Sequence, residues 1–177
     1  MISYYFREFP LTCIIVALNV AIFIWINALA PNPYLYLNVP GTFSLGTFLA
    51  HFAHQSIIHI FFNMFVFAQI SPILEKYLGQ MTYLLVLVAI WILTVGLMRP
   101  VLDTPTLGFS GILMGLMSFV IFLFYHVPQI RNQLVFWLGI NLLVGLSPGI
   151  SFWGHFMGAL AGLIVFFTYS MTRDRRG

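Results

Sequence analysis

Residues 82–98 of the chain read TYLLVLVAIWILTVGLM, a run that contains no charged side chain. Uncharged apolar stretches of about this length are typical of transmembrane helices. The rest of the chain has the same character, because 61% of its 177 residues are hydrophobic and only 6% are charged. A soluble domain carries about 25% charged residues. The composition therefore excludes a water-soluble globule and a disordered chain, and it predicts an integral membrane protein.

Five further apolar segments flank this run, and proline, glycine and charged residues separate them. The six segments are 11–29, 57–77, 82–98, 110–125, 134–148 and 155–171. We expect each to be a spanning helix, so that residues 1–177 form one all-α membrane domain with a six-helix bundle. The alternative for the first segment is a signal peptide, since Ala28-Leu29-Ala30 resembles a cleavage site. Its length and the Pro31 that follows disfavour cleavage.

The distribution of lysine and arginine predicts the orientation of the helices, because cytoplasmic loops are enriched in both. With the N-terminus inside, the cytoplasmic basic residues are Arg7, Lys76, Arg131, Arg173, Arg175 and Arg176. Only Arg99 then lies outside. We therefore expect a multi-pass membrane protein with both termini cytoplasmic. The net charge of +3 is too small and too dispersed to indicate a nucleic-acid partner.

Polar side chains occur at the outer ends of the three segments that run inward, where polarity is costly and indicates function. His59 and Asn63 lie one helical turn apart in the second segment. Ser110 opens the fourth segment and His155 opens the sixth. The expected topology puts all four at one depth. We expect them to form a site that opens to the outer face.

These four residue types suit peptide hydrolysis through an acyl-enzyme. A serine hydroxyl needs a base to take its proton, and a histidine suits that task. The tetrahedral intermediate needs hydrogen-bond donors at its oxyanion, which Asn63, His59 and the backbone N–H of Ser110 could supply. The acidic residues fall in tails, in an outer loop or at the inner end of the second segment. We therefore expect a dyad of Ser110 and His155 without an acid.

Each of these residues also has a purely structural interpretation. A lone serine in a spanning helix commonly bonds a carbonyl of its own helix, and a single buried histidine is commonly a packed structural group. Gly111 with Gly115, and Gly158 with Gly162, are pairs of small residues four apart that favour close helix packing whatever the function. The combination of all these features at one depth favours catalysis.

The joint pattern resembles the rhomboid family of intramembrane serine proteases, from about His51 to Gly162. The residues that carry the resemblance are His54, His59, Asn63, Glu75, Gly79, Gly108-Phe109-Ser110-Gly111 and His155-x-x-Gly158-x-x-x-Gly162. The resemblance implies the minimal six-span bacterial form, with Ser110 as nucleophile, His155 as general base, and Asn63 and His59 as oxyanion donors. It also implies single-span membrane proteins as substrates, and no metal or cofactor.

The sequence departs from the family pattern at three places. Leu45-Gly46 stand where many members have a Trp-Arg pair, and Met114 stands where many have a tyrosine. Ser71-Pro72 replace the glycine that usually precedes the glutamate of the second helix. None of these changes removes a catalytic group. We expect them to affect loop structure, stability and substrate preference.

Two other classes of protein remain as alternatives. An inactive relative that binds membrane clients would have lost the serine or the histidine, and both are present. A zinc site formed by His51, His54 and His59 would need an open position and usually a fourth ligand, and no Asp or Glu stands nearby. The metalloprotease motif His-Glu-x-x-His is absent from the sequence. We expect the outer histidines His51 and His54 both to tolerate alanine better than the site residues do, with His54 costing more stability through a loop hydrogen bond.

Overall fold

The computed structural model describes residues 2–29 and 36–174, and in these ranges the chain is helical apart from turns, loops and one isolated antiparallel bridge. The chain forms two compact units. The first contains the residues up to Leu85 together with Asp103–Phe109, and the second contains Val86–Leu102 and the chain from Ser110 onward. The polypeptide therefore passes between the units at three bonds: Leu85–Val86, Leu102–Asp103 and Phe109–Ser110.

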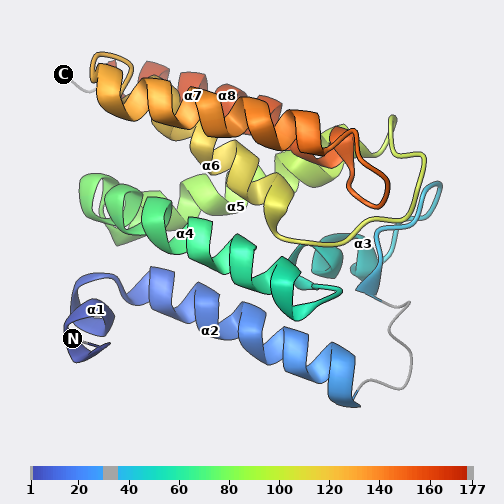
Figure 1. Ribbon diagram of the computed structural model, residues 1–177. Coiled ribbons are helices and arrows are strands. Elements are labelled where there is room, and N and C mark those ends of the chain that lie inside the picture. The colour runs from blue at the N-terminus through green and yellow to red at the C-terminus, as the bar shows by residue number, and fades with distance from the viewer. Residues whose placement is uncertain (1, 30–35, 175–177) are drawn as a thin grey trace. The chain divides into compact units, whose positions relative to one another are not determined.

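The helices follow the apolar segments of the sequence (Figure 1). Those of the first unit are α1 (Ile2–Glu8), α2 (Pro10–Ile24), the π-helical turn η1 (Trp25–Leu29), α3 (Leu45–Leu49), the 3-10 turn η3 (Ala50–Phe52) and α4 (Ile57–Leu78). The long helix α5 (Gln80–Met98) begins in the first unit and continues in the second. The second unit also contains α6 (Ser110–Leu123), α7 (Pro128–Val144) and α8 (Phe152–Asp174).

Four helices of the described chain are long and apolar enough to cross a membrane. They are Pro10–Leu29, Ile57–Leu78, Gln80–Met98 and Phe152–Arg173. Helix α6 is apolar but has only 14 residues, which is about 21 Å of helix against a hydrocarbon core of about 30 Å. The prediction of an all-helical membrane protein is confirmed, whereas the count of six spans stays a prediction.

The predicted and observed boundaries differ most at the fifth segment. The sequence predicted 134–148, but α7 begins at Pro128 and ends at Val144. Proline is well placed in the first turn of a helix, because the N–H that it lacks would have no partner there. Pro128 therefore starts α7, whereas the sequence pattern places prolines between the segments. Helix α8 likewise begins at Phe152, before the predicted 155–171.

In the first unit, α2 and α4 lie side by side and run in opposite directions (Figure 1). The buried carboxylate of Glu75 on α4 accepts hydrogen bonds from the backbone N–H groups of Leu11 and Thr12, both at 2.9 Å. These N–H groups lie in the first turn of α2, where a helix offers them no partner of its own. Phe9, which precedes α2, makes no side-chain cap. Glu75 therefore caps α2 from the neighbouring helix.

A chain of three hydroxyl groups extends this cap. The Thr12 hydroxyl donates to Glu75 at 2.7 Å, the Ser71 hydroxyl lies 2.6 Å from that of Thr12, and the Tyr83 hydroxyl lies 2.5 Å from that of Ser71. Each hydroxyl has one proton to donate. The donor order is therefore Tyr83 to Ser71, Ser71 to Thr12, and Thr12 to Glu75. Ser71, which departs from the family pattern, is a link in this chain.

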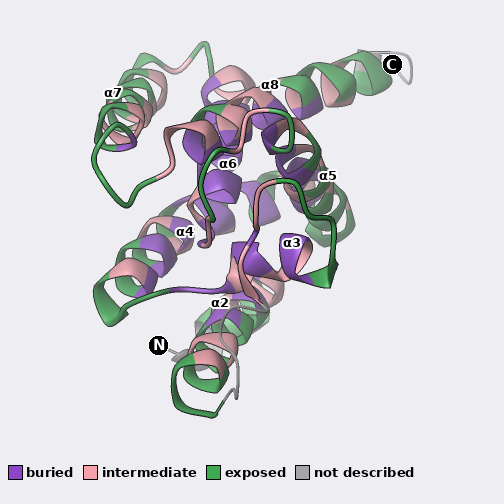
Figure 2. Cartoon of the chain, turned by 90° about the vertical axis from the view of Figure 1, so that its right-hand side faces the viewer, coloured by how far each residue is buried: buried purple, intermediate pink, exposed green. Residues whose placement is uncertain are grey.

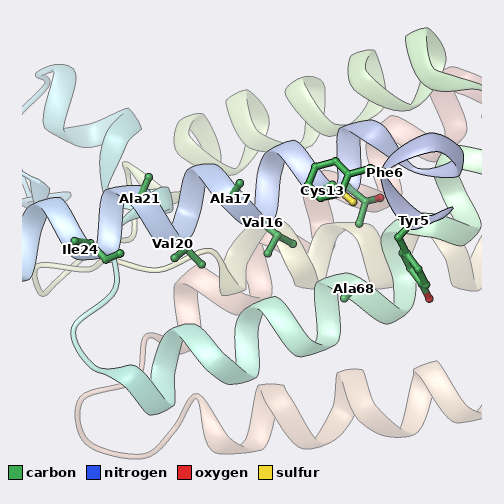
Figure 3. A pocket seen from close by; sticks show the side chains of 10 residues that line it. Tyr5, Phe6, Cys13, Val16, Ala17, Val20, Ala21, Ile24 and Ala68 are labelled. Atoms are coloured by element: carbon green, nitrogen blue, oxygen red, sulfur yellow. The ribbon is translucent and has the colours of Figure 1, made fainter. Parts of the chain in front are cut away.

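A groove of about 500 Å³ runs along α2 of the first unit (Figure 3). Cys13, Ala17 and Ala21 line it from one row of α2, and Ala68 lines it from α4. Its lining is almost entirely apolar, as expected for a surface that faces lipid acyl chains. None of the four predicted catalytic side chains lines this groove.

In the second unit, α6 is the buried helix. All eleven residues from Gly111 to Ile121 are buried, whereas no residue of α7 is buried. Figure 2 shows this contrast, with α6 in the colour of buried residues over most of its length. Because α8 packs along α6, the two ends of this helix pair determine where Ser110 and His155 lie.

Candidate active site

Ser110 is the first residue of α6, as the sequence predicted. The N–H groups of the first turn of a helix have no partner within that helix, and the helix dipole gives this end a partial positive charge. Gly108, two residues earlier, has φ +121°, a conformation that side-chain-bearing residues rarely adopt. The chain therefore enters α6 through a turn that needs glycine at position 108.

The ring of His155 is oriented by the backbone of the neighbouring helix. His155 is buried in the first turn of α8, and its Nδ1 lies 2.9 Å from the carbonyl oxygen of Asn141 on α7. A carbonyl oxygen can only accept, so Nδ1 carries the proton of this hydrogen bond. The lone pair of the neutral ring is then on Nε2. This is the tautomer that a general base needs.

Glycines bring the backbones of α6 and α8 into contact beside these two residues. A Cβ at Gly111, next to Ser110, would lie 3.1 Å from the carbonyl oxygen of Gly154, next to His155. A Cβ at Gly158 would collide with the backbone of Gly111. Ser110 and His155 therefore lie at the same crossing of one helix pair.

The same contact recurs one turn further along the two helices. A Cβ at Gly162 would collide with the backbone of Gly115. In the described structure no hydrogen bond joins the Ser110 hydroxyl to His155. Such bonds are often long in unliganded enzymes and tighten with substrate. The two glycine pairs hold α6 and α8 at a backbone-to-backbone separation that lets side chains at the crossing approach each other.

His59 and Asn63 face the backbone of Gly108 within the first unit. A Cβ at Gly108 would lie 2.7 Å from Cε1 and 2.8 Å from Nε2 of His59, and 3.9 Å from Nδ2 of Asn63. The Asn63 amide nitrogen is buried and has no hydrogen-bond partner in the described structure. Buried donors are nearly always satisfied, so an unsatisfied one calls for a functional explanation.

The structure thus assembles the four predicted residues as two pairs. His59 and Asn63 lie with Gly108 in the first unit, and Ser110 lies with His155 in the second. Of the positions that depart from the family pattern, Met114 is buried one turn after Ser110 on α6. Leu45 and Gly46 begin α3, where Leu45 is exposed and Gly46 is buried.

His51 and His54 are buried in the segment that leads into α4. Burial lowers the pKa of His51 to about 4. Burial also lowers the pKa of His54 to about 4, and the nearby ring of His59 adds to this effect. Both rings are therefore neutral at pH 7. Their nitrogens have no partner with good hydrogen-bond geometry in the described structure.

A loop hydrogen bond from the His54 side chain stays a prediction. The Phe52 backbone acts on the His54 ring as a hydrogen-bond acceptor and partly offsets the lowering of its pKa. The His54 backbone also has a partner, because its carbonyl oxygen accepts from Asn27 Nδ2 at 3.2 Å. The ring packs edge to face on His59, with the ring centroids 5.0 Å apart. Nothing in the sequence pairs Asn27 with His54, since the two residues are 27 positions apart.

Two further features of the site have no sequence signal. Asn38 and Thr106 exchange backbone hydrogen bonds of 2.9 and 3.0 Å, and the Gly108 N–H donates to the Ala50 carbonyl at 2.9 Å. The first loop therefore holds the segment that leads to Ser110. In the described chain no three His, Cys, Asp or Glu side chains are arranged to bind a metal ion, so the alternative of a zinc site has no ligand set there.

Comparison with known proteins relates this arrangement to one family. Residues 44–172 match the family model described as a rhomboid domain, and this range contains His59, Asn63, Ser110 and His155. A protein of Emericella nidulans named Rhomboid-type serine protease 2 is 28% identical over 139 residues, which cover 71% of this chain. The chain spans about 28% of the length of that curated relative.

Proposed function

This chain belongs to the rhomboid protease family, and we propose that it is an intramembrane serine endopeptidase that uses Ser110 as nucleophile and His155 as general base. One observation carries the proposal: α6 and α8 touch backbone to backbone beside these two residues. The hydrogen bond from His155 Nδ1 to the Asn141 carbonyl supports it, because it leaves Nε2 able to take a proton.

The reaction would proceed through an acyl-enzyme. Ser110 Oγ attacks the carbonyl carbon of the scissile peptide bond while His155 Nε2 takes the hydroxyl proton. The protonated ring then donates this proton to the leaving amine as the C–N bond breaks. A water molecule, deprotonated by the same ring, hydrolyses the ester and restores the serine. The backbone hydrogen bond at Nδ1 would hold the ring in one orientation through both steps.

Asn63, His59 and the Ser110 N–H would stabilise the oxyanion. Both side chains face Gly108, and consecutive Cα atoms are about 3.8 Å apart, so the Cα of Ser110 lies within about 7.6 Å of that of Gly108. The unsatisfied Asn63 amide would gain its acceptor when the oxyanion forms.

The setting of this reaction follows the sequence predictions. The chain would form a single six-span bundle of the minimal bacterial type in an inner (cell) membrane, with both termini cytoplasmic and the site open to the outer face. Its substrates would be single-span membrane proteins, cut within or next to the bilayer. The reaction needs no metal or cofactor, because serine and histidine supply both the nucleophile and the proton transfers.

Labelling and cleavage measured together test the proposal. The purified protein in detergent is treated with a fluorophosphonate probe and, separately, with a single-span reporter substrate. We expect labelling at Ser110 and cleavage of the reporter, and we expect Ser110→Ala and His155→Ala each to abolish both. The double variant should be no worse than either single variant, because the two groups act as a unit. Cleavage by Ser110→Ala at the native rate would refute the assignment.

A further inference from the structure

We propose that His54 is a positioning residue for His59: its ring, packed edge to face, holds the His59 imidazole against Gly108, where His59 can donate to the oxyanion. This inference rests on the function proposed above. It assigns a role to a buried histidine that the hydrolytic dyad does not use.

The backbone of His59 is fixed independently of its ring. Ser56 precedes α4, and its hydroxyl accepts a hydrogen bond from the His59 N–H at 3.2 Å, which caps the helix. This cap fixes the backbone position of His59, but the ring can still rotate about its two side-chain torsions. Ring contacts therefore have to select the orientation.

The His59 ring packs on the His54 ring and on the backbone of Gly108. Its Cε1 and Nε2 lie so close to Gly108 that a Cβ there would come within 2.8 Å of both atoms. The His54 ring packs on it at a centroid separation of 5.0 Å and an interplanar angle of 72°. Edge-to-face packing of this kind is favourable between aromatic rings, so it favours one rotamer of the His59 ring.

His54 is itself held in place. Its residue is only 1% exposed, and its carbonyl oxygen accepts a hydrogen bond from Asn27 Nδ2. The same amide nitrogen of Asn27 donates to the Phe23 carbonyl at 2.9 Å, so both of its protons are used. The end of the first spanning helix is thereby tied to the residue that packs on His59.

The His54 ring acts on His59 through packing, not through a hydrogen bond or a charge. Neither nitrogen of the His54 ring has a partner with good hydrogen-bond geometry in the described structure. The ring adds no charge next to His59, because burial keeps it neutral near pH 7. A ring without nitrogen atoms should therefore serve as well, which distinguishes positioning by packing from a polar role.

Three variants test the inference: His54→Ala, His54→Phe and the matched control His51→Ala. His51 is also buried with neutral nitrogens. We expect His54→Ala to lower kcat on the reporter substrate about 10-fold to 100-fold, as a misplaced catalytic group does. KM and the extent of Ser110 labelling should stay near native values. His54→Phe should restore most of kcat, and His51→Ala should keep it.

A double-mutant cycle separates positioning from general stability. If His54 acts through His59, then His54→Ala should cost little further activity when His59 is already alanine. Losses that multiply in the double variant, or a native kcat in folded His54→Ala, would overturn the inference. The proposed function fails separately, if Ser110→Ala still cleaves the reporter.

A second variant covers the case in which His54→Ala does not fold. Asn27 is exposed, so Asn27→Ala removes the anchor of His54 without opening the core. It should lower kcat by a few-fold, and it should do so only while His59 is present. An unchanged kcat in Asn27→Ala, or an equal loss in the His59→Ala background, would also overturn the inference.

Discussion

The two ends of α4 carry polar clusters of opposite character. At one end, the Glu75 carboxylate accepts three hydrogen bonds from Leu11 and Thr12, and two further hydroxyl groups complete the chain. At the other end are the buried nitrogens of His51, His54 and the Asn63 amide. In the described structure none of them has a hydrogen-bond partner with good geometry. One helix thus supports a satisfied cluster and an unsatisfied one.

This difference indicates what each end is for. A satisfied buried cluster stabilises the fold, and its partners are lost together if one is removed. An unsatisfied buried donor lowers stability by about 1–3 kcal/mol, so it persists where function requires it. We infer that the Glu75 end holds α2 and α4 together. The His59 end is less stable because it keeps hydrogen-bond donors without a partner, ready for the oxyanion.

The largest expected effect is at the satisfied end. Glu75→Ala leaves the Leu11 and Thr12 N–H groups and the Thr12 hydroxyl without their acceptor. Three hydrogen bonds to a charged group are together worth about 4.5–9 kcal/mol. Removing a buried charge recovers part of its desolvation cost, so we expect a loss of about 3–5 kcal/mol in unfolding free energy. The unfolding free energy in detergent measures this loss. As a second measurement, kcat is determined per active site, with the active sites counted by fluorophosphonate labelling of Ser110. A stable Glu75→Ala variant with a large loss in kcat would reverse the roles of the two ends.

At the unsatisfied end, Asn63→Ala should do the opposite. Removing one oxyanion donor costs about 2.7–4 kcal/mol in transition-state stabilisation, or about 10²–10³ in kcat. Unfolding stability should stay level or rise, because an unsatisfied buried donor is removed. Asn19→Ala is the control, since Asn19 is also buried with an unsatisfied oxygen but lies on α2. It should change stability and leave kcat near native; equal kcat losses in both would contradict the comparison.

The pH dependence of stability tests the two histidines of the unsatisfied end. Their pKa is about 4 in the folded protein and about 6.5 when unfolded. The unfolded state then binds more protons between these values, so stability is fully present above pH 6.5 and falls as pH drops toward 4. Each ring should cost about 2 kcal/mol by pH 5. The measurement is the stability to thermal unfolding as a function of pH, for the native protein and for the double variant His51→Leu/His54→Phe. Equal pH dependence of stability in the two proteins would contradict the prediction.

The sequence predicts the parts that depend on local composition and spacing. The apolar segments located five of the long helices to within a few residues, and Ser110 was correctly placed at the start of α6. The contacts missed are between residues far apart in sequence. Glu75 was placed outside the catalytic set by topology, but nothing local pairs it with Thr12, 63 residues away. The contact of Asn27 with His54 was missed for the same reason.

The fifth segment failed for a different reason. The apolar run predicts a helix over 134–148, but α7 starts at Pro128 and includes the polar residues Gln129, Arg131, Asn132 and Gln133. A polar first turn is compatible with a helix end that leaves the apolar layer, so hydropathy marks the membrane-facing part rather than the whole helix. Proline at the first helical position would have been the better signal.

The smallest expected effect is at the far end of the satisfied chain. Tyr83→Phe removes one hydroxyl, and Ser71 then keeps its donation to Thr12 but loses the proton it accepts. A single neutral hydrogen bond is worth about 0.5–1.5 kcal/mol. We therefore expect a loss of about 1 kcal/mol, with no change in kcat. Ser71→Ala should cost more, because it removes the middle hydroxyl of the series and leaves the buried Tyr83 hydroxyl without its acceptor.

The donor assignment is tested by comparing the stability losses of the single variants with that of the double variant. If Tyr83 donates to Ser71, then Tyr83→Phe should cost little once Ser71 is alanine, and the double variant should resemble Ser71→Ala alone. Tyr125→Phe, on an exposed tyrosine that follows α6, is the control and should stay within about 0.5 kcal/mol of native. Additive losses in the double variant would mean that the two hydroxyls stabilise the protein independently, and the Glu75 end would then be several separate contacts rather than one cooperative cluster.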